Sequence, residues 1–189
     1  MGLPQEKPEK IYTYADYAEW ELEEGERYEL LDGVPHMMAV PSIRHQSASV
    51  ELVYQLRHFL KSKHCELFHA PFDVCLFGLG DQDRNVVQPD ILVVCDKKKL
   101  EDGKRCNDAP ELVIEILSPS TMYHDLFRKL GKYLQAGVRE IWMVDPVMKK
   151  VYVHLLENNK DDSKEYSKTD IVPVTVLEGC MINLNDVFA

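Results

Sequence analysis

Two runs of residues decide the fold, Val86-Val87-Gln88-Pro89-Asp90-Ile91-Leu92-Val93-Val94 and Leu112-Val113-Ile114-Glu115-Ile116-Leu117. Both are apolar on either face and rich in valine and isoleucine, a pattern typical of strands buried inside a sheet. Each run nevertheless holds one carboxylate, and a buried charge is costly unless something compensates it. Because the two strands could lie side by side, the pattern indicates that Asp90 and Glu115 share a divalent cation.

The spacing of the two carboxylates fits this interpretation. They are 115 − 90 = 25 residues apart, which suits neighbouring strands joined by the charged loop Asp96–Asp108. Magnesium prefers hard oxygen ligands, polarises phosphoryl groups and activates water for in-line attack. The structural alternative is a pair of buried carboxylates satisfied by backbone donors and an arginine. Both interpretations stay open from the residues alone.

Composition suits one globular domain spanning residues 1–189, with 45% hydrophobic residues and no visible linker. No apolar stretch approaches the roughly 20 residues that span a bilayer, and the polar first ten residues lack the core of a signal peptide. The five cysteines are scattered and odd in number. Cys75 and Cys95 lie in strand-like runs that suit buried free thiols, so we expect a reducing cytoplasm.

The charge balance argues against a nucleic-acid partner, because 22 basic residues face 32 acidic ones and the net charge is −10. Net charge does not fix its distribution, however. Basic residues flank the two carboxylate strands and could form a local basic rim: Lys97-Lys98-Lys99, Lys104-Arg105, Arg128-Lys129 and Lys132. The alternative is that they lie on solvated loops and a helix face.

Periodicity and turn signals predict an α+β fold, a mixed sheet with helices on its faces. The expected helices are 13–25, capped by Thr13 with Asp16, then 45–63 and 122–136, the last capped by residues 118–121 and ended by Gly137. The expected strands are a hairpin of 27–32 and 34–40 turning at Asp32-Gly33, then 72–77, 86–95, 112–117, 140–145 and 150–156. Residues 157–164 read as a polar hairpin tip.

A set of short motifs resembles one protein family. They are Tyr28-Glu29-Leu30-Leu31-Asp32-Gly33, Pro41-Ser42 with His45, Gln88-Pro89-Asp90, Glu115-Ile116-Leu117-Ser118-Pro119-Ser120-Thr121, then Asp125, Lys129 and Tyr133, Gly137-Val138, and Ile141-Trp142-Met143-Val144-Asp145-Pro146. Pro89-Asp90 followed by Glu115 looks like the PD-(D/E)XK nuclease signature, and the order of the motifs resembles the Uma2 family (DUF820). The resemblance implies a restriction-endonuclease-like fold and an endonuclease that needs Mg²⁺ or Mn²⁺, cuts DNA and acts as a homodimer.

The resemblance implies functional roles for the residues of this chain that match the family's motifs. It implies Asp90 and Glu115 as metal ligands, with the backbone carbonyl of Ile116 as a third. Glu29 matches an acidic residue that related nucleases carry on an early element, where it can hold metal-bound water or a second ion. The alternative for Glu29 is a glutamate on the surface of the hairpin.

The chain departs from the signature at its third position, where Leu117 replaces the usual lysine. That lysine would orient the attacking water and stabilise negative charge. Lys129 is the candidate replacement, because Asp125, Lys129 and Tyr133 form one stripe on the helix after the Glu115 strand. The alternative is an ordinary Asp125–Lys129 ion pair. His45 either orients a phosphate or helps to cap its helix.

The sequence also bears on an alternative function and on a possible zinc site. A nuclease-fold interaction module without catalysis is the alternative function, favoured by the net charge of −10 and by Leu117. A zinc site around His58, His64, Cys65 and His69 is not supported, because no CxxC or HxxxH spacing accompanies them.

Overall fold

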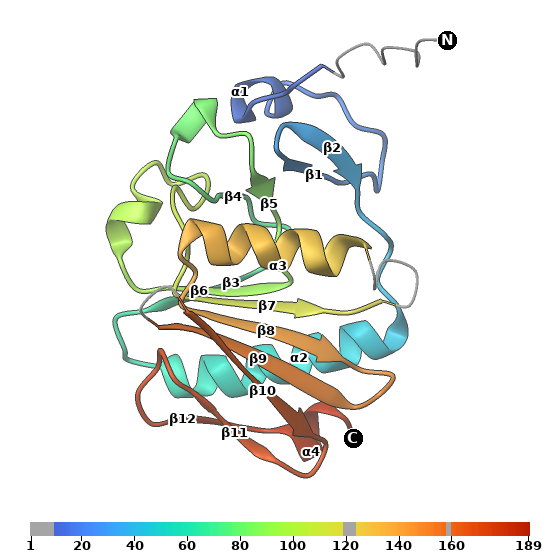
Figure 1. The fold of residues 1–189 in the computed structure, drawn as a ribbon, viewed down its shortest axis with the longest axis vertical. Coiled ribbons are helices and arrows are strands. Elements are labelled where there is room, and N and C mark those ends of the chain that lie inside the picture. Colours follow the sequence, from blue (N-terminus) through green and yellow to red (C-terminus); the bar gives the residue numbers. More distant parts are fainter. Residues whose placement is uncertain (1–9, 119–123, 158–159) are drawn as a thin grey trace.

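A computed structural model describes residues 10–118, 124–157 and 160–189, except for the side chains of residues 124–127 (Figure 1). The helices are α1 (Tyr14–Tyr17), α2 (Ile43–Leu60), α3 (His124–Ala136), α4 (Leu184–Val187) and the 3-10 turns η1 (Gly80–Gln82) and η2 (Lys97–Leu100). The strands are β1 (Tyr28–Leu31), β2 (Val34–Met37), β3 (Glu66–His69), β4 (Val74–Cys75), β5 (Val86–Val87), β6 (Ile91–Val94), β7 (Leu112–Ile116), β8 (Glu140–Asp145), β9 (Lys150–Glu157), β10 (Lys160–Ser167), β11 (Ile171–Val174) and β12 (Cys180–Asn183).

The central layer is a six-stranded sheet in the order β10-β9-β8-β7-β6-β3. Strands β7 and β8 pair in parallel and the other neighbours pair antiparallel, so the sheet is mixed as predicted. Helix α2 packs on one face together with β11, β12 and α4, and α3 covers the other face (Figure 1). The prediction of an α+β fold with helices on both faces is confirmed.

The predicted strand 86–95 is wrong in one respect, because it is two strands in two sheets. Strand β5 belongs to a small sheet in the order β2-β1-β5-β4, whereas β6 belongs to the large sheet. The break falls at Gln88-Pro89-Asp90. Proline has no backbone N–H to donate to a ladder, so a strand interior tolerates it poorly. Asp90 therefore lies where the chain passes from one sheet to the other.

Other element boundaries differ from the predictions for local reasons. Asp16 accepts the backbone N–H of Thr13 at 2.9 Å as expected, but α1 ends at Tyr17 instead of near residue 25. Beyond it the ring of Trp20 makes edge contacts with Tyr17 and Tyr28 (centroids 5.4 and 6.0 Å apart), which turns the chain out of the helical path. Predicted strand 72–77 shrinks to β4, and the polar stretch from residue 160 is strand β10, paired with β9. The proposed helix cap at residues 119–121 lies outside the described residues.

The cysteine prediction is wrong for Cys95, which forms a disulfide with Cys65. Strand β3 was not foreseen from the sequence, and its pairing with β6 through Glu66 and Val94 brings the two cysteines opposite each other. Cys75, Cys106 and Cys180 are buried free thiols. Separately, none of the helices in residues 10–118, 124–157 and 160–189 has the length and apolar character needed to cross a membrane.

Candidate active site

One pocket brings the predicted site residues together from four parts of the fold. Glu29 comes from β1, Asp90 from the turn before β6, Glu115 from β7 and Lys129 from α3. The start of α2 and the segment that leads into it, including Met38 to Pro41, form the opposite wall. The polar side chains on this pocket are Arg27, Glu29, His36, His45, Asp90, Glu115, Ser118 and Lys129.

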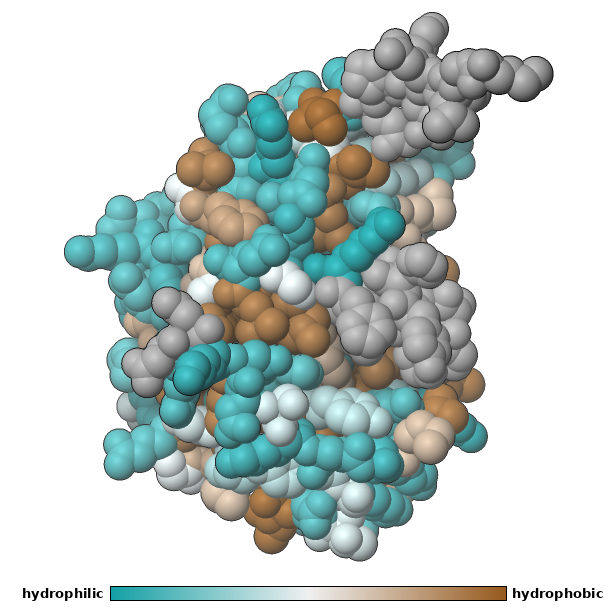
Figure 2. Space-filling view, viewed as in Figure 1, coloured by the Kyte–Doolittle hydropathy of each residue, from teal (hydrophilic) through white to brown (hydrophobic). Residues whose placement is uncertain are grey.

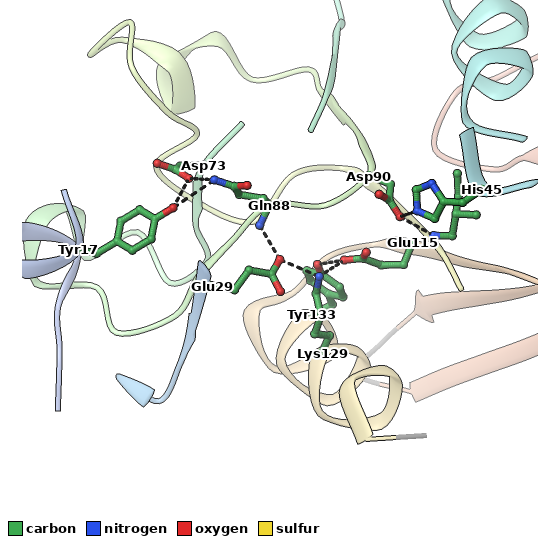
Figure 3. Close-up of polar contacts among 10 residues, drawn as sticks. Tyr17, Glu29, His45, Asp73, Gln88, Asp90, Glu115, Lys129 and Tyr133 are labelled. Carbon is green, nitrogen blue, oxygen red and sulfur yellow. Dashed lines mark hydrogen bonds and ion pairs between the residues drawn. The ribbon is translucent and has the colours of Figure 1, made fainter. Parts of the chain in front are cut away.

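The antiparallel pairing of β6 with β7 places the two signature carboxylates next to each other. Ile91 lies opposite Ile114, so Asp90 and Glu115 fall at the same end of the pair (Figure 3). Side chains alternate along a strand. Ile114 and Ile116 pack into the core beneath α2, so Glu115 points to the α3 face.

Asp90 is held by two hydrogen bonds to the same oxygen. Its Oδ2 accepts the backbone N–H of Ile116 at 2.7 Å, and the Nε2 of His45 lies 3.1 Å away. These contacts leave Oδ1 without a hydrogen bond from any described residue. His45 is 9% exposed and stands in the first turn of α2. The helix cap is Ser42, whose hydroxyl accepts the His45 backbone N–H at 3.2 Å, so His45 takes part in the cap through its backbone while its side chain contacts Asp90.

Lys129 lies between two carboxylates. Its Nζ is 2.6 Å from Glu115 Oε1 and 2.8 Å from Glu29 Oε1, and the residue is 7% exposed. Burial alone would lower the pKa of Lys129, but the adjacent Glu115 and Glu29 raise it, so the ammonium stays charged. Leu117 has 9% exposure and belongs to the apolar cluster under α3. A lysine from α3 thus reaches the carboxylates that a lysine at position 117 would otherwise approach.

Glu115 is a carboxyl group of the pocket with a raised pKa. Burial raises its pKa to about 7, Lys129 opposes this shift, and Asp90 and Glu29 add to it. The hydroxyl of Tyr133, one turn beyond Lys129, also donates to Glu115 Oε1. The predicted stripe on α3 is therefore present for Lys129 and Tyr133, whereas the side chain of Asp125 lies outside the described residues.

Glu29 is 5% exposed, so the alternative of a surface hairpin glutamate is wrong. Its Oε1 accepts the backbone N–H of Gln88 at 2.7 Å. The hairpin that carries it turns at Asp32 and Gly33, both with positive φ, of 55° and 78°. A Cβ at Gly33 would come within 2.8 Å of the Tyr12 carbonyl oxygen, so only glycine fits this turn.

Sequence reasoning missed a polar network behind Glu29. The Nε2 of Gln88 donates to Asp73 Oδ1 at 2.9 Å and lies 3.1 Å from the Tyr17 hydroxyl, which itself donates to Asp73 (Figure 3). The position of Gln88 beside Pro89-Asp90 was the available signal for it. Tyr17 and Asp73 carried no such signal, because neither lies near a motif in the chain.

The donor set fits a divalent cation. Three carboxylates and one ammonium leave two negative charges (3 − 1 = 2) when all four groups are ionised. Within the described ranges, Asp90 Oδ1, Glu115 Oε2 and Glu29 Oε2 accept no hydrogen bond, and oxygen ligands of this kind suit Mg²⁺ or Mn²⁺. Ile116, whose carbonyl is the expected third ligand, lines the pocket and donates its backbone N–H to Asp90.

The predicted basic rim is largely neutralised by acids. Ion pairs join Lys99 to Glu111 (2.8 Å), Arg105 to Asp81 (2.9 Å), Lys132 to Asp32 (2.5 Å) and Lys97 to Glu66 (3.3 Å). Paired in this way, these four basic residues do not form a continuous phosphate-binding surface, and Lys99 and Arg105 are also too buried for the alternative of solvated side chains.

The fold is shared with a solved structure. The crystal structure of a "putative nuclease belonging to DUF820" from Anabaena variabilis ATCC 29413 matches with a TM-score of 0.75 and 20% identity, over 93% of this chain and 97% of that one. Residues 14–185 match the Uma2 family model, described as "Putative restriction endonuclease", and the chain belongs to this family. The "Uncharacterized protein slr1290" of Synechocystis sp. is 29% identical over 118 residues, 62% of this chain and 60% of that protein.

Proposed function

We propose that this protein is an endonuclease that hydrolyses phosphodiester bonds in DNA with the help of Mg²⁺ or Mn²⁺. The observation that carries the proposal is the convergence of Glu29, Asp90, Glu115 and Lys129 on one pocket from four separate elements. Buried charges are costly to assemble, and perturbed ionisable groups gathered in a cleft favour a functional role over a structural one.

In this proposal Asp90 and Glu115 bind the cation, with the carbonyl of Ile116 as a further ligand. A cation held by these ligands would supply polarisation of the scissile phosphate and a lowered pKa for a water molecule. His45 and the Ile116 N–H fix Asp90 Oδ2, so that the carboxylate presents Oδ1 to the pocket. Orientation of a ligand by hydrogen bonds from outside the coordination shell is general among metal sites.

Lys129 takes the role of the lysine absent at position 117. Its permanent positive charge, maintained by Glu115 and Glu29, can orient the attacking water and stabilise the charge that develops on the phosphate. Glu29 holds the ammonium in place, and its Oε2, which accepts no hydrogen bond from the described residues, could bind water beside a cation. Because cutting both strands of a duplex needs two such sites, we expect the active form to be a homodimer.

The first prediction is divalent-dependent cleavage. The purified protein should convert supercoiled plasmid to nicked or linear DNA in Mg²⁺ or Mn²⁺, and a chelator should stop the reaction because the carboxylates then lack their cation. Gel electrophoresis of the plasmid measures both effects. Equal cleavage with and without the chelator would contradict the metal-dependent mechanism.

The second prediction concerns His45. His45→Ala should weaken Mn²⁺ binding about 10- to 100-fold, the usual loss when a residue that orients a metal ligand is removed. Isothermal titration calorimetry with Mn²⁺ measures the dissociation constant. His58→Ala is the matched control, because His58 is exposed on the same helix. An unchanged constant in His45→Ala would remove His45 from the site.

A second candidate function is a nuclease-fold binding module without catalysis. Lys129 already bonds both Glu115 and Glu29, so these two carboxylates are partly neutralised without a cation. The net charge of −10 and the paired basic residues also favour this function. Calorimetry distinguishes the two, since this module should bind no divalent ion at millimolar concentration.

A further inference from the structure

Three side chains of the kinds that bind zinc lie together at the opposite end of β6 from Asp90. His64 and Cys65 precede β3, and Cys95 follows β6, its antiparallel partner. The Nε2 of His64 is 3.4 Å from Cys65 Sγ. All three ligand atoms lie within 4.8 Å of one another. In the oxidised protein the two sulfurs are joined as a disulfide.

We propose that the reduced protein binds a zinc ion through His64, Cys65 and Cys95. Spacing along the chain does not indicate this site, because Cys95 lies 30 residues after Cys65 and the pairing of β3 with β6 brings the two together. Zinc takes thiolate and imidazole ligands at about 2.3 and 2.0 Å, so a tetrahedral site separates a nitrogen from a sulfur ligand by about 3.5 Å. The His64–Cys65 contact of 3.4 Å already meets that requirement. After reduction the sulfurs need only separate to about 3.8 Å, the distance between two thiolates on one zinc ion.

The change of state balances in electrons and protons. A thiol reductant gives two electrons and two protons to the disulfide and itself becomes a disulfide, which leaves Cys65 and Cys95 as thiols. Each thiol then loses its proton to solvent when its sulfur binds the metal, since thiolate is the ligand form. Two thiolates neutralise the charge of Zn²⁺, and the neutral imidazole of His64 adds the third ligand.

The surroundings of the three residues permit zinc binding. His64 is exposed, so an ion can enter from solvent. Cys65 is 6% exposed, so its sulfur is largely shielded from solvent. Three protein ligands leave one position for water. The carboxylate pocket offers carboxylate oxygens and no cysteine thiolate, so the two sites favour different metals. This inference is independent of the proposed nuclease function.

Cobalt is the probe that tests the site, because thiolate-bound Co²⁺ has an intense sulfur-to-metal charge-transfer absorption that carboxylate-bound Co²⁺ lacks. The full-length protein is reduced with a dithiol, desalted without oxygen and titrated with Co²⁺. We expect this absorption to saturate at one equivalent in the reduced protein, to be absent in the oxidised protein, and to vanish when Zn²⁺ is added.

Variants assign the ligands. Cys95→Ser should abolish the absorption, and His64→Ala, a surface change that leaves the core intact, should weaken Co²⁺ binding at least tenfold. Cys180→Ser is the matched control, because Cys180 is a buried free thiol on β12, and it should behave as the unsubstituted protein. Absence of the absorption in the reduced protein, or its full retention in Cys95→Ser, would overturn the proposal.

Discussion

Glu115→Gln is expected to reduce DNA cleavage by roughly 10³-fold or more, the largest effect of any single substitution in the pocket. The change keeps the shape of the side chain and an oxygen that Tyr133 can donate to, but it removes the charge that binds the cation. Loss of several kcal/mol of transition-state stabilisation corresponds to this factor. The initial rate of plasmid nicking measures it, and Glu115→Ala should behave in the same way.

Glu111→Gln is the control for this substitution. Glu111 is also a buried carboxylate paired with a lysine, Lys99 at 2.8 Å, but it lies outside the pocket. Its replacement should lower stability and leave the cleavage rate near that of the unsubstituted protein. If Glu115→Gln retains full activity while circular dichroism shows a native fold, Glu115 is not a metal ligand in catalysis.

Lys129→Met is expected to lower the cleavage rate about 10²- to 10³-fold, the range for removal of one group that stabilises developing charge. Methionine preserves the length and apolar stem of the side chain. It leaves Glu115 and Glu29 without their shared ammonium, so their mutual repulsion increases and cation binding should be retained or strengthened. The rate should therefore fall without a matching loss of metal affinity, which calorimetry with Mn²⁺ measures.

A double variant tests whether Lys129 replaces the missing lysine of the signature. Leu117 lines the same pocket, two residues after Glu115 on the same strand face. Adding Leu117→Lys to Lys129→Met returns an ammonium to the usual position, and we expect it to restore part of the lost rate. A folded double variant with no gain over Lys129→Met would show that position 117 cannot serve this function.

Much of the fold was predictable because buried strands and helices show a characteristic pattern of apolar residues in the sequence. Strands β7 and β8 are continuous apolar runs, and α2 repeats its apolar positions at helical spacing. Asp90 and Glu115 were recognisable for the same reason, since a charge inside such a run is conspicuous. Lys129 was identified only through the family resemblance, because nothing in a helical stripe reveals which strand it faces.

The remaining features depend on contacts between distant parts of the chain. The sequence offered no means to see that His45, 45 residues before Asp90, would bond its carboxylate. Strand β3 is short and only half buried, so its pairing with β6 and the approach of Cys65 to Cys95 left no periodic signal. Pro89 is the local signal that the run 86–94 is not one strand, because proline has no N–H to donate to a strand ladder.

The passage of the chain between two sheets at Asp90 has a consequence for cooperativity. Glu29 belongs to the small sheet and Glu115 to the large one, and Lys129 bonds both. The proposed constellation of Glu29, Glu115 and Lys129 therefore exists only while the two sheets are docked. Local unfolding of the short strands β4 and β5 would dismantle it and leave the six-stranded sheet intact. We therefore expect the activity of the proposed site to be lost at the temperature at which this docking fails, which can lie below that of global denaturation.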